Sequence, residues 1–130
     1  MNNQYYISEA KRSASIQINE LKKIKKIFNK SFIKAVDLIL NCKGKIIFAG
    51  IGKSGLIARK ISATLASTGT PSFFLHPAEA IHGDLGMLKK EDVVVLISYS
   101  GETEEIIKLL PSLKKLNVST VLFDIIIILL

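Results

Sequence analysis

The sequence predicts an α/β fold of three layers, in which helices cover both faces of a parallel sheet. Short apolar runs rich in isoleucine, valine and phenylalanine alternate with longer stretches of helical periodicity. This β–α–β order is typical of parallel strands joined by right-handed crossovers. Residues 93–98 are apolar on both faces of a strand, as a central parallel strand requires. A chain of 130 residues that is 48% hydrophobic is long enough for one domain with a true core.

Residues 1–30 are expected to lie outside the main domain and to form one long amphipathic helix, from about Ser8 to Asn29. Its apolar residues recur along one stripe, which contains Ala10, Ala14, Leu21, Ile24 and Phe28. Ser31 is the expected N-cap of a second helix that runs to about Asn41. Gly44 is expected to end that helix in the left-handed conformation.

The main domain, residues 31–124, continues as strands that alternate with helices. Strands are expected at residues 45–49, 72–75, 93–98 and 118–123. The helix Lys53–Thr68 is expected to bury three residues, Ile57, Ile61 and Leu65. A later helix is marked by Ile106, Ile107, Leu110, Leu113 and Leu116, and Pro111 is expected to kink it or end it early. The segment His76–Leu88 is not periodic, which favours a functional loop.

The composition excludes several classes of protein. The one cysteine, Cys42, rules out a disulfide framework and fits a reducing cytoplasm. No signal peptide is visible and no apolar run has the length of a membrane span, so no membrane partner is expected. The net charge is +7, and residues 1–70 hold 13 of the 18 basic residues. A solvated helix face explains these lysines better than a nucleic-acid site, because no aromatic residues are interleaved on the basic face.

A glycine-rich turn follows the first strand and opens the next helix. The run Gly50-Ile-Gly-Lys-Ser-Gly55 matches the dinucleotide pattern G-x-G-x-x-G, which is weak alone. The acid that holds the NAD ribose is missing, because His76 follows the second strand. A Walker A loop is also excluded, since Ile47 stands where its first glycine is required. The turn therefore favours a phosphate ligand smaller than a dinucleotide.

A second turn follows the third expected strand and carries three hydroxyl residues, Ser98, Ser100 and Thr103, around a glycine. Capping of the following helix is one explanation of these hydroxyls. Binding of a sugar phosphate is the other. The carboxyl ends of parallel strands share one edge of the sheet, so both turns and the segment His76–Leu88 are expected to face one crevice there.

Five motifs together resemble one family: Gly-Ile-Gly-Lys-Ser-Gly (50–55), Ala-Ser-Thr-Gly-Thr-Pro-Ser-Phe-Phe (66–74), His-Pro-Ala-Glu-Ala (76–80), His-Gly-Asp-Leu-Gly-Met (82–87) and Ser-Tyr-Ser-Gly-Glu-Thr (98–103). They are similar to the sugar isomerase (SIS) domain of D-arabinose 5-phosphate isomerases, a Rossmann- or flavodoxin-like fold, over about residues 30–123. The resemblance implies interconversion of ribulose 5-phosphate and arabinose 5-phosphate, which supplies the Kdo precursor for lipopolysaccharide or capsule. It also implies a pentose 5-phosphate substrate, no cofactor and a homotetramer.

The resemblance assigns roles to individual residues. Lys53 and Glu105 map to catalytic positions, and His82 maps to a substrate contact that can shuttle a proton. Further substrate-binding positions are Gly52, Ser54, Gly69, Thr70, Ser98, Ser100 and Thr103. His76 maps to a position where zinc binds and inhibits. From the residues alone, Lys53 is equally a phosphate counter-ion, and Glu104 fits the first turn of a helix as well as Glu105 does.

The end of the chain departs from the family pattern. Family members continue with a further catalytic glutamate, a Thr/Ser-rich loop and a histidine in a Ser-His-Pro-Gly-Gly context, and many add paired CBS domains. Here the residues after the fourth strand read Asp124-Ile-Ile-Ile-Ile-Leu-Leu. Residues 125–130 are therefore expected to be an aberrant apolar tail on an incomplete sheet, with isomerase turnover at or below detection. The alternative is a non-catalytic module that binds a sugar phosphate.

Overall fold

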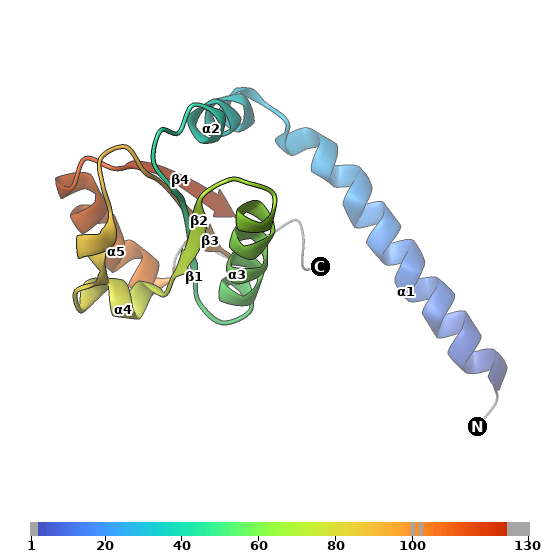
Figure 1. The fold of residues 1–130 in the computed structure, drawn as a ribbon. Coiled ribbons are helices and arrows are strands. Elements are labelled where there is room, and N and C mark those ends of the chain that lie inside the picture. The colour runs from blue at the N-terminus through green and yellow to red at the C-terminus, as the bar shows by residue number, and fades with distance from the viewer. Residues whose placement is uncertain (1–2, 100, 102, 125–130) are drawn as a thin grey trace.

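The fold is a four-stranded parallel sheet between two layers of helices (Figure 1). The computed structural model describes residues 3–99, 101 and 103–124. The strands are β1 (Ile46–Gly50), β2 (Ser72–Leu75), β3 (Val93–Ser98) and β4 (Ser119–Asp124), in the spatial order β2-β1-β3-β4. The predicted fold class is confirmed. Strands 72–75 and 93–98 have the predicted bounds, and the other two lie one residue later than predicted.

Each face of the sheet has its own apolar core. The helices are α1 (Asn3–Lys23), α2 (Lys30–Leu40), α3 (Gly52–Ser67), α4 (Pro77–Ile81) and α5 (Glu104–Lys115), with 3₁₀ turns η1 (Ile24–Ile27) and η2 (Asp84–Met87). Ile47 and Leu96 pack with α4 and α5 on one face. Phe48 and Val95 pack with α3 on the other. Successive residues of β1 and β3 thus enter opposite cores, as the pleat of a strand requires.

The N-terminal region differs from its prediction in two ways. The helix predicted from about Ser8 to Asn29 begins earlier, at Asn3, and ends as an α-helix at Lys23, after which it continues as the 3₁₀ turn η1. The N-cap of α2 is Asn29, not Ser31, because Asn29 Oδ1 accepts hydrogen bonds from the backbone N–H groups of Ser31 (2.8 Å) and Phe32 (3.2 Å). An asparagine in an extended conformation satisfies two amides of the first turn at once.

Gly44 does not adopt the left-handed conformation expected of it. It is required for space instead, because a Cβ at this position would overlap the buried carboxylate of Asp92. That carboxylate accepts hydrogen bonds from the backbone N–H groups of Lys45 (2.7 Å) and Lys89 (2.8 Å). Asp92 thereby ties together the chain segments that enter β1 and β3, at the amino edge of the sheet.

Helix α3 lies close to the sheet because its inner face is made of small residues, Ser54, Gly55, Ala58 and Ser62. A Cβ at Gly55 would lie 2.6 Å from the carbonyl oxygen of Gly50. The predicted buried residues Ile57 and Leu65 are half-buried, but the prediction for Ile61 is wrong, since this side chain is 36% exposed. The periodicity of the apolar residues predicted where the helix lies. It did not predict which face is buried, because that face is set by the close contact between the backbones of Gly55 and Gly50.

One further expectation requires correction. The segment His76–Leu88, expected to be irregular, contains α4 and η2. Pro77 stands at the first position of α4, and His76 Nδ1 accepts a hydrogen bond from the N–H of Ala78 (3.3 Å). The helix therefore begins with two features typical of a helix N-terminus, a proline in the first position and a side-chain N-cap. Of the two outcomes expected at Pro111, a kink or an early end, the early end does not occur, because helix α5 continues past Pro111 to Lys115.

The apolar residues that marked α5 in the sequence fall into two groups. Ile106 and Leu113 are buried, together with Leu109, while Ile107, Leu110 and Leu116 are exposed. No helix in the described part of the chain is both long enough and apolar enough to cross a membrane. Residues 125–130, expected to be an apolar tail, lie outside the described residues.

Candidate functional site

The first glycine turn joins β1 to α3 at the carboxyl edge of the sheet. Gly52 has a φ of +57°, a conformation that glycine adopts without steric cost. Ile51, the N-cap residue of α3, makes no side-chain capping bond. The first amides of α3 therefore remain open to a ligand, and the helix dipole favours an anion there.

The second turn is closed by hydroxyl groups. Ser98 is buried, and its Oγ lies 2.9 Å from Oγ1 of Thr103 and accepts a hydrogen bond from the N–H of Gly101 at 3.0 Å. Thr103 occupies the N-cap position of α5 but makes no side-chain capping bond. The capping explanation therefore fails for Ser98 and Thr103, whose hydroxyls hold the turn together. Ser100 lies outside the described residues.

The two turns share one cavity of about 470 Å³, lined by Ile51, Lys53, Ser54, Tyr99 and Thr103. This volume lies within the usual range for small-molecule sites. Three of the lining residues were candidates from the sequence, while Ile51 and Tyr99 were missed. Both follow the last residue of a strand directly, a position that identifies side chains at the carboxyl edge. Ser54 is buried, whereas Lys53 is exposed.

The two glutamates of α5 have different environments. Glu104 pairs with Lys108 one turn later, with 2.5 Å between Oε1 and Nζ. The hydrogen bond from Lys108 lowers the pKa of Glu104 and raises that of Lys108. Glu105 is half-buried and has no ion pair with any residue that the structure describes. Glu104 is therefore paired on the surface, whereas Glu105 is unpaired among the described residues, and neither glutamate is among the residues that line the cavity.

Neither histidine is among the residues that line the cavity, although His76 directly follows the end of β2 at the same edge of the sheet. His82 is exposed and follows the last residue of α4. His76 caps α4 through Nδ1, and its ring contacts Phe74 edge to face. The described residues contain no cluster of three or more His, Cys, Asp or Glu side chains that would hold a metal ion.

Gly69 and Thr70 are not brought to this cavity. They join the end of α3 to the start of β2, at the amino edge of the sheet, where the carbonyl of Pro71 accepts from the N–H of Ile46 (2.9 Å). Helix α3 has 16 residues and separates the two edges by about 24 Å. One pentose phosphate does not span that distance, so a single copy of the described chain does not place Gly69, Thr70 and Lys53 around one ligand.

Comparison with known proteins decides the family. The model of the SIS domain matches residues 39–127. The chain belongs to the SIS domain family. The matched range covers all four strands of the sheet and both turns of the cavity, and the resemblance seen in the sequence motifs is confirmed.

The relatives of this SIS domain carry consistent names. It is 57% identical to a probable arabinose 5-phosphate isomerase of Haemophilus influenzae, over 84% of this chain and 32% of the relative. It is 47% identical to arabinose 5-phosphate isomerase KdsD of Pseudomonas aeruginosa, over 89% of this chain and 36% of the relative. The chain thus spans about a third of the length of the curated relatives it matches.

Solved structures agree with these names. The structure of E. coli CFT073 c3406 in complex with arabinose 5-phosphate superposes with a TM-score of 0.85 at 48% identity, over 95% of this chain and 66% of that one. A putative sugar-phosphate isomerase of Listeria monocytogenes also superposes with a TM-score of 0.85, at 32% identity, over 94% of this chain and 64% of that one.

Proposed function

We propose that this SIS domain is part of an aldose–ketose isomerase that interconverts D-ribulose 5-phosphate and D-arabinose 5-phosphate. One observation carries the proposal: Lys53 and Ser54 of the first turn and Thr103 of the second line a single cavity at the carboxyl edge of the sheet. The names of the relatives at 43–57% identity support the same activity.

The phosphate is held at the first turn. Open amides at the start of α3 attract an anion, the Ser54 hydroxyl donates a hydrogen bond, and Lys53 contributes positive charge. The sugar carbons then extend toward Thr103 and Tyr99 on the other wall of the cavity. No dinucleotide is needed to explain these contacts, and the reaction needs no cofactor.

The reaction moves a proton between two adjacent carbons through an enediol. Glu105 removes the proton from C2 of the aldose and returns it to C1. Lys53 stabilises the negative charge on the substrate oxygens, and His82 carries a proton between O1 and O2. The half-buried carboxylate of Glu105, without a described ion pair, supports its role as the base more than that of the paired Glu104.

The same proposal covers the pathway, the cellular compartment, the assembly and the inhibition by zinc. The product supplies the Kdo precursor for lipopolysaccharide or capsule, in the cytoplasm, and the protein acts as a homo-oligomer. Zinc inhibits through Nε2 of His76, because Nδ1 of this ring already caps α4. Gly69 and Thr70 contact substrate only in an assembly, since α3 separates them from Lys53.

Calorimetric titration tests the ligand class. Arabinose 5-phosphate and ribulose 5-phosphate are expected to bind more tightly than NAD, and Lys53→Ala is expected to weaken their binding at least about tenfold. Lys60→Ala is the matched control, because Lys60 is an exposed lysine of the same helix outside the cavity. Tighter binding of NAD than of either pentose phosphate would contradict the proposal.

Exchange of the carbon-bound substrate proton with deuterated solvent, followed by NMR, separates an isomerase from a binding module. Exchange that is lost in Glu105→Gln supports proton transfer by this chain. Tight binding without any exchange would favour a non-catalytic module that binds a sugar phosphate.

A further inference from the structure

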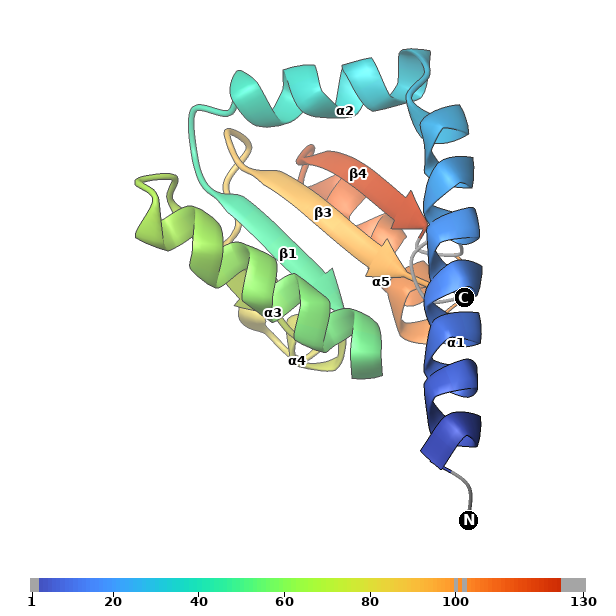
Figure 2. The ribbon, with the colours of Figure 1, turned by 90° about the vertical axis from the view of Figure 1, so that its right-hand side faces the viewer.

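Tyr99 contributes an aromatic side chain to the wall of the cavity of about 470 Å³, which we call the carboxyl-edge cavity. It directly follows Ser98, the last residue of β3. Figure 2 shows β1 and β3 side by side, with their arrowheads at one edge of the sheet and the start of α3 just beyond them. Because Tyr99 is 45% exposed, its side chain is open to a ligand at this edge.

The pleat of β3 directs Tyr99 toward the first turn of α3. Ile97 packs in the core on the face of the sheet that α3 covers, whereas Leu96 packs in the core on the opposite face. Tyr99 lies two residues beyond Ile97, so it continues the row on the α3 face. The cavity wall that Tyr99 shares with Lys53 and Ser54 agrees with this direction.

The hydroxyl group of Tyr99 is free to bind a ligand. It has no hydrogen-bond partner among the residues that the structure describes. The hydroxyl of Thr103, on the same wall, is already joined to Oγ of Ser98 at 2.9 Å, and Ile51 offers only an apolar side chain. Among the described lining residues that do not hold the phosphate in the proposed function, Tyr99 therefore has the hydroxyl with all of its hydrogen-bonding capacity left.

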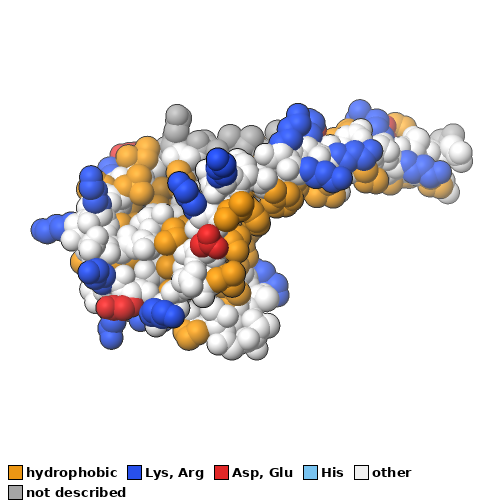
Figure 3. All heavy atoms as spheres, turned by 90° about the horizontal axis from the view of Figure 1, so that it is seen from above, with side chains coloured by type: hydrophobic (Ala, Val, Ile, Leu, Met, Phe, Trp, Pro, Cys, Tyr) orange, Lys and Arg blue, Asp and Glu red, His pale blue; other side chains and the backbone are white. Residues whose placement is uncertain are grey.

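Positive charge alone does not decide where the phosphate of a ligand lies. The net charge of the chain is +7, and Figure 3 shows basic side chains spread over the body of the domain and along α1. The carboxyl-edge cavity differs from the rest of this surface because the open amides of the first turn of α3 lie beside it. With the phosphate at those amides, the rest of the ligand extends along the wall that carries Tyr99.

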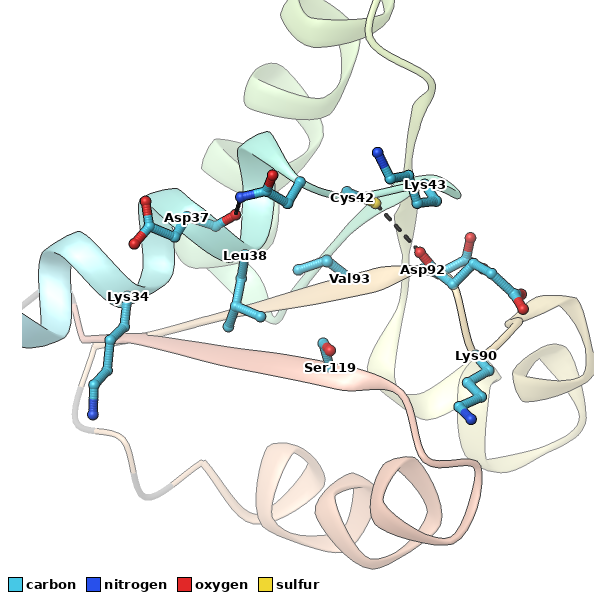
Figure 4. A pocket seen from close by; sticks show the side chains of 11 residues that line it. Lys34, Asp37, Leu38, Cys42, Lys43, Lys90, Asp92, Val93 and Ser119 are labelled. Carbon is cyan, nitrogen blue, oxygen red and sulfur yellow. Dashed lines mark hydrogen bonds between the residues drawn. The ribbon is translucent and has the colours of Figure 1, made fainter.

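A larger cavity of about 560 Å³ lies at the amino edge of the sheet and does not offer the same combination. Its lining carries three basic and three acidic side chains, which are Lys34, Lys43, Lys90, Asp37, Glu91 and Asp92. It lies beside the C-terminal end of α2, where the helix dipole disfavours an anion. Figure 4 shows Leu38 pointing from α2 toward the strands in this cavity, near Val93 and Ser119. A phosphate ligand therefore favours the carboxyl-edge cavity.

We infer that Tyr99 distinguishes a sugar phosphate from phosphate alone, because its hydroxyl forms a hydrogen bond with a hydroxyl group of the sugar. A tyrosine side chain has an apolar body and a polar tip, which matches a sugar chain with both C–H and hydroxyl groups. The inference rests on the proposed function, since it takes the phosphate to lie at the first turn with Lys53 and Ser54. It assigns recognition of the sugar to a residue of the second turn.

Tyr99→Phe tests the inference directly, because it removes the hydroxyl and keeps the ring. Calorimetric titration is carried out with arabinose 5-phosphate and with inorganic phosphate. The variant is expected to bind the sugar phosphate about 2- to 12-fold more weakly than the wild-type chain, the effect of one hydrogen bond between neutral groups, and to bind inorganic phosphate equally well. Tyr99→Ala is expected to weaken the binding of arabinose 5-phosphate further, because it also removes the ring.

Two further variants serve as controls. Tyr5→Phe makes the same chemical change at a tyrosine of α1 that is 61% exposed and outside the cavity, and it is expected to change neither affinity. Lys53→Ala is expected to weaken the binding of both ligands, because both contain the phosphate. The urea unfolding midpoint of Tyr99→Phe is expected to equal that of the wild-type chain, since the hydroxyl has no partner among the described residues.

Two results would overturn the inference and leave the proposed function standing, in a wild-type chain that binds arabinose 5-phosphate. An unchanged affinity of Tyr99→Phe for arabinose 5-phosphate would show that the hydroxyl does not contact the sugar. An equal loss of affinity for arabinose 5-phosphate and for inorganic phosphate would show that Tyr99 belongs to the phosphate site. A wild-type chain that does not bind arabinose 5-phosphate would overturn the proposed function, and this inference with it.

Discussion

The hydroxyl oxygens of Ser98 and Thr103 lie 2.9 Å apart and join the end of β3 to the start of α5. Ser98 is buried and also accepts a hydrogen bond from the N–H of Gly101, so its hydroxyl group has two partners within the turn. Thr103 in turn forms part of the cavity wall. The same threonine therefore both holds the turn together and lines the proposed binding site.

Thr103→Val is expected to destabilise the protein by about 1–3 kcal/mol, because it removes the hydrogen-bond partner of the buried Ser98 hydroxyl at position 103. It is also expected to weaken the binding of arabinose 5-phosphate. Thr103→Ser keeps the hydroxyl and serves as the control. Urea unfolding and calorimetric titration measure the two effects, and an unchanged unfolding midpoint in the valine variant would show that the bond is not formed.

Gly55→Ala is expected to cost about 1–3 kcal/mol of stability, because the new methyl group would lie 2.6 Å from the carbonyl oxygen of Gly50 and force α3 away from β1. Gly52→Ala meets no atom within 4 Å and is expected to cost about 1–2 kcal/mol through its left-handed backbone alone. Gly52→Asn should recover part of that loss, since asparagine tolerates this conformation, while Gly55→Asn should not. Equal recovery at both positions in urea unfolding would contradict the packing explanation.

Glu105→Gln is expected to lower the rate of substrate proton exchange about 10²–10⁴-fold, because it removes the proposed base. Glu104→Gln removes the neighbouring carboxylate, which pairs with Lys108 on the surface, and is expected to change the rate by less than about twofold. NMR in deuterated solvent measures both rates. An equal loss of exchange rate in the two variants would mean that the rate depends on the negative charge of the first turn of α5 and not on Glu105 as a specific base.

Asp92→Asn is expected to destabilise the protein by about 1–3 kcal/mol. The carboxylate accepts from two backbone N–H groups, at Lys45 and Lys89, and an amide offers only one oxygen to them. Binding of pentose phosphates should be unchanged at temperatures where the variant is folded, because Asp92 lies at the edge of the sheet opposite the cavity. A selective loss of binding would contradict that separation of roles.

Local sequence was sufficient for most of the architecture. The alternation of apolar strands with periodic helices predicted the three layers, and β2 and β3 were located to the residue. The glycine turn of Gly50–Gly55 and the hydroxyl turn of Ser98–Thr103 were also recognisable, because the residues of a tight turn are neighbours in the chain. Their placement at one edge followed from the rule that parallel strands end together.

Tertiary structure alone decided which side chains share an environment. Ile61 fits the periodic stripe of α3, yet it is exposed, because close backbone contact at Gly55 turns the small residues of the helix inward. Glu104 and Glu105 are alike in sequence and differ only through Lys108 and burial. Thr70 lies about 24 Å from Lys53 because a whole helix separates them. The burial of Glu105 and the orientation of α3 depend on how these helices pack on the sheet, which the periodicity of one helix does not encode, whereas the Glu104–Lys108 pair joins residues four apart on one helix.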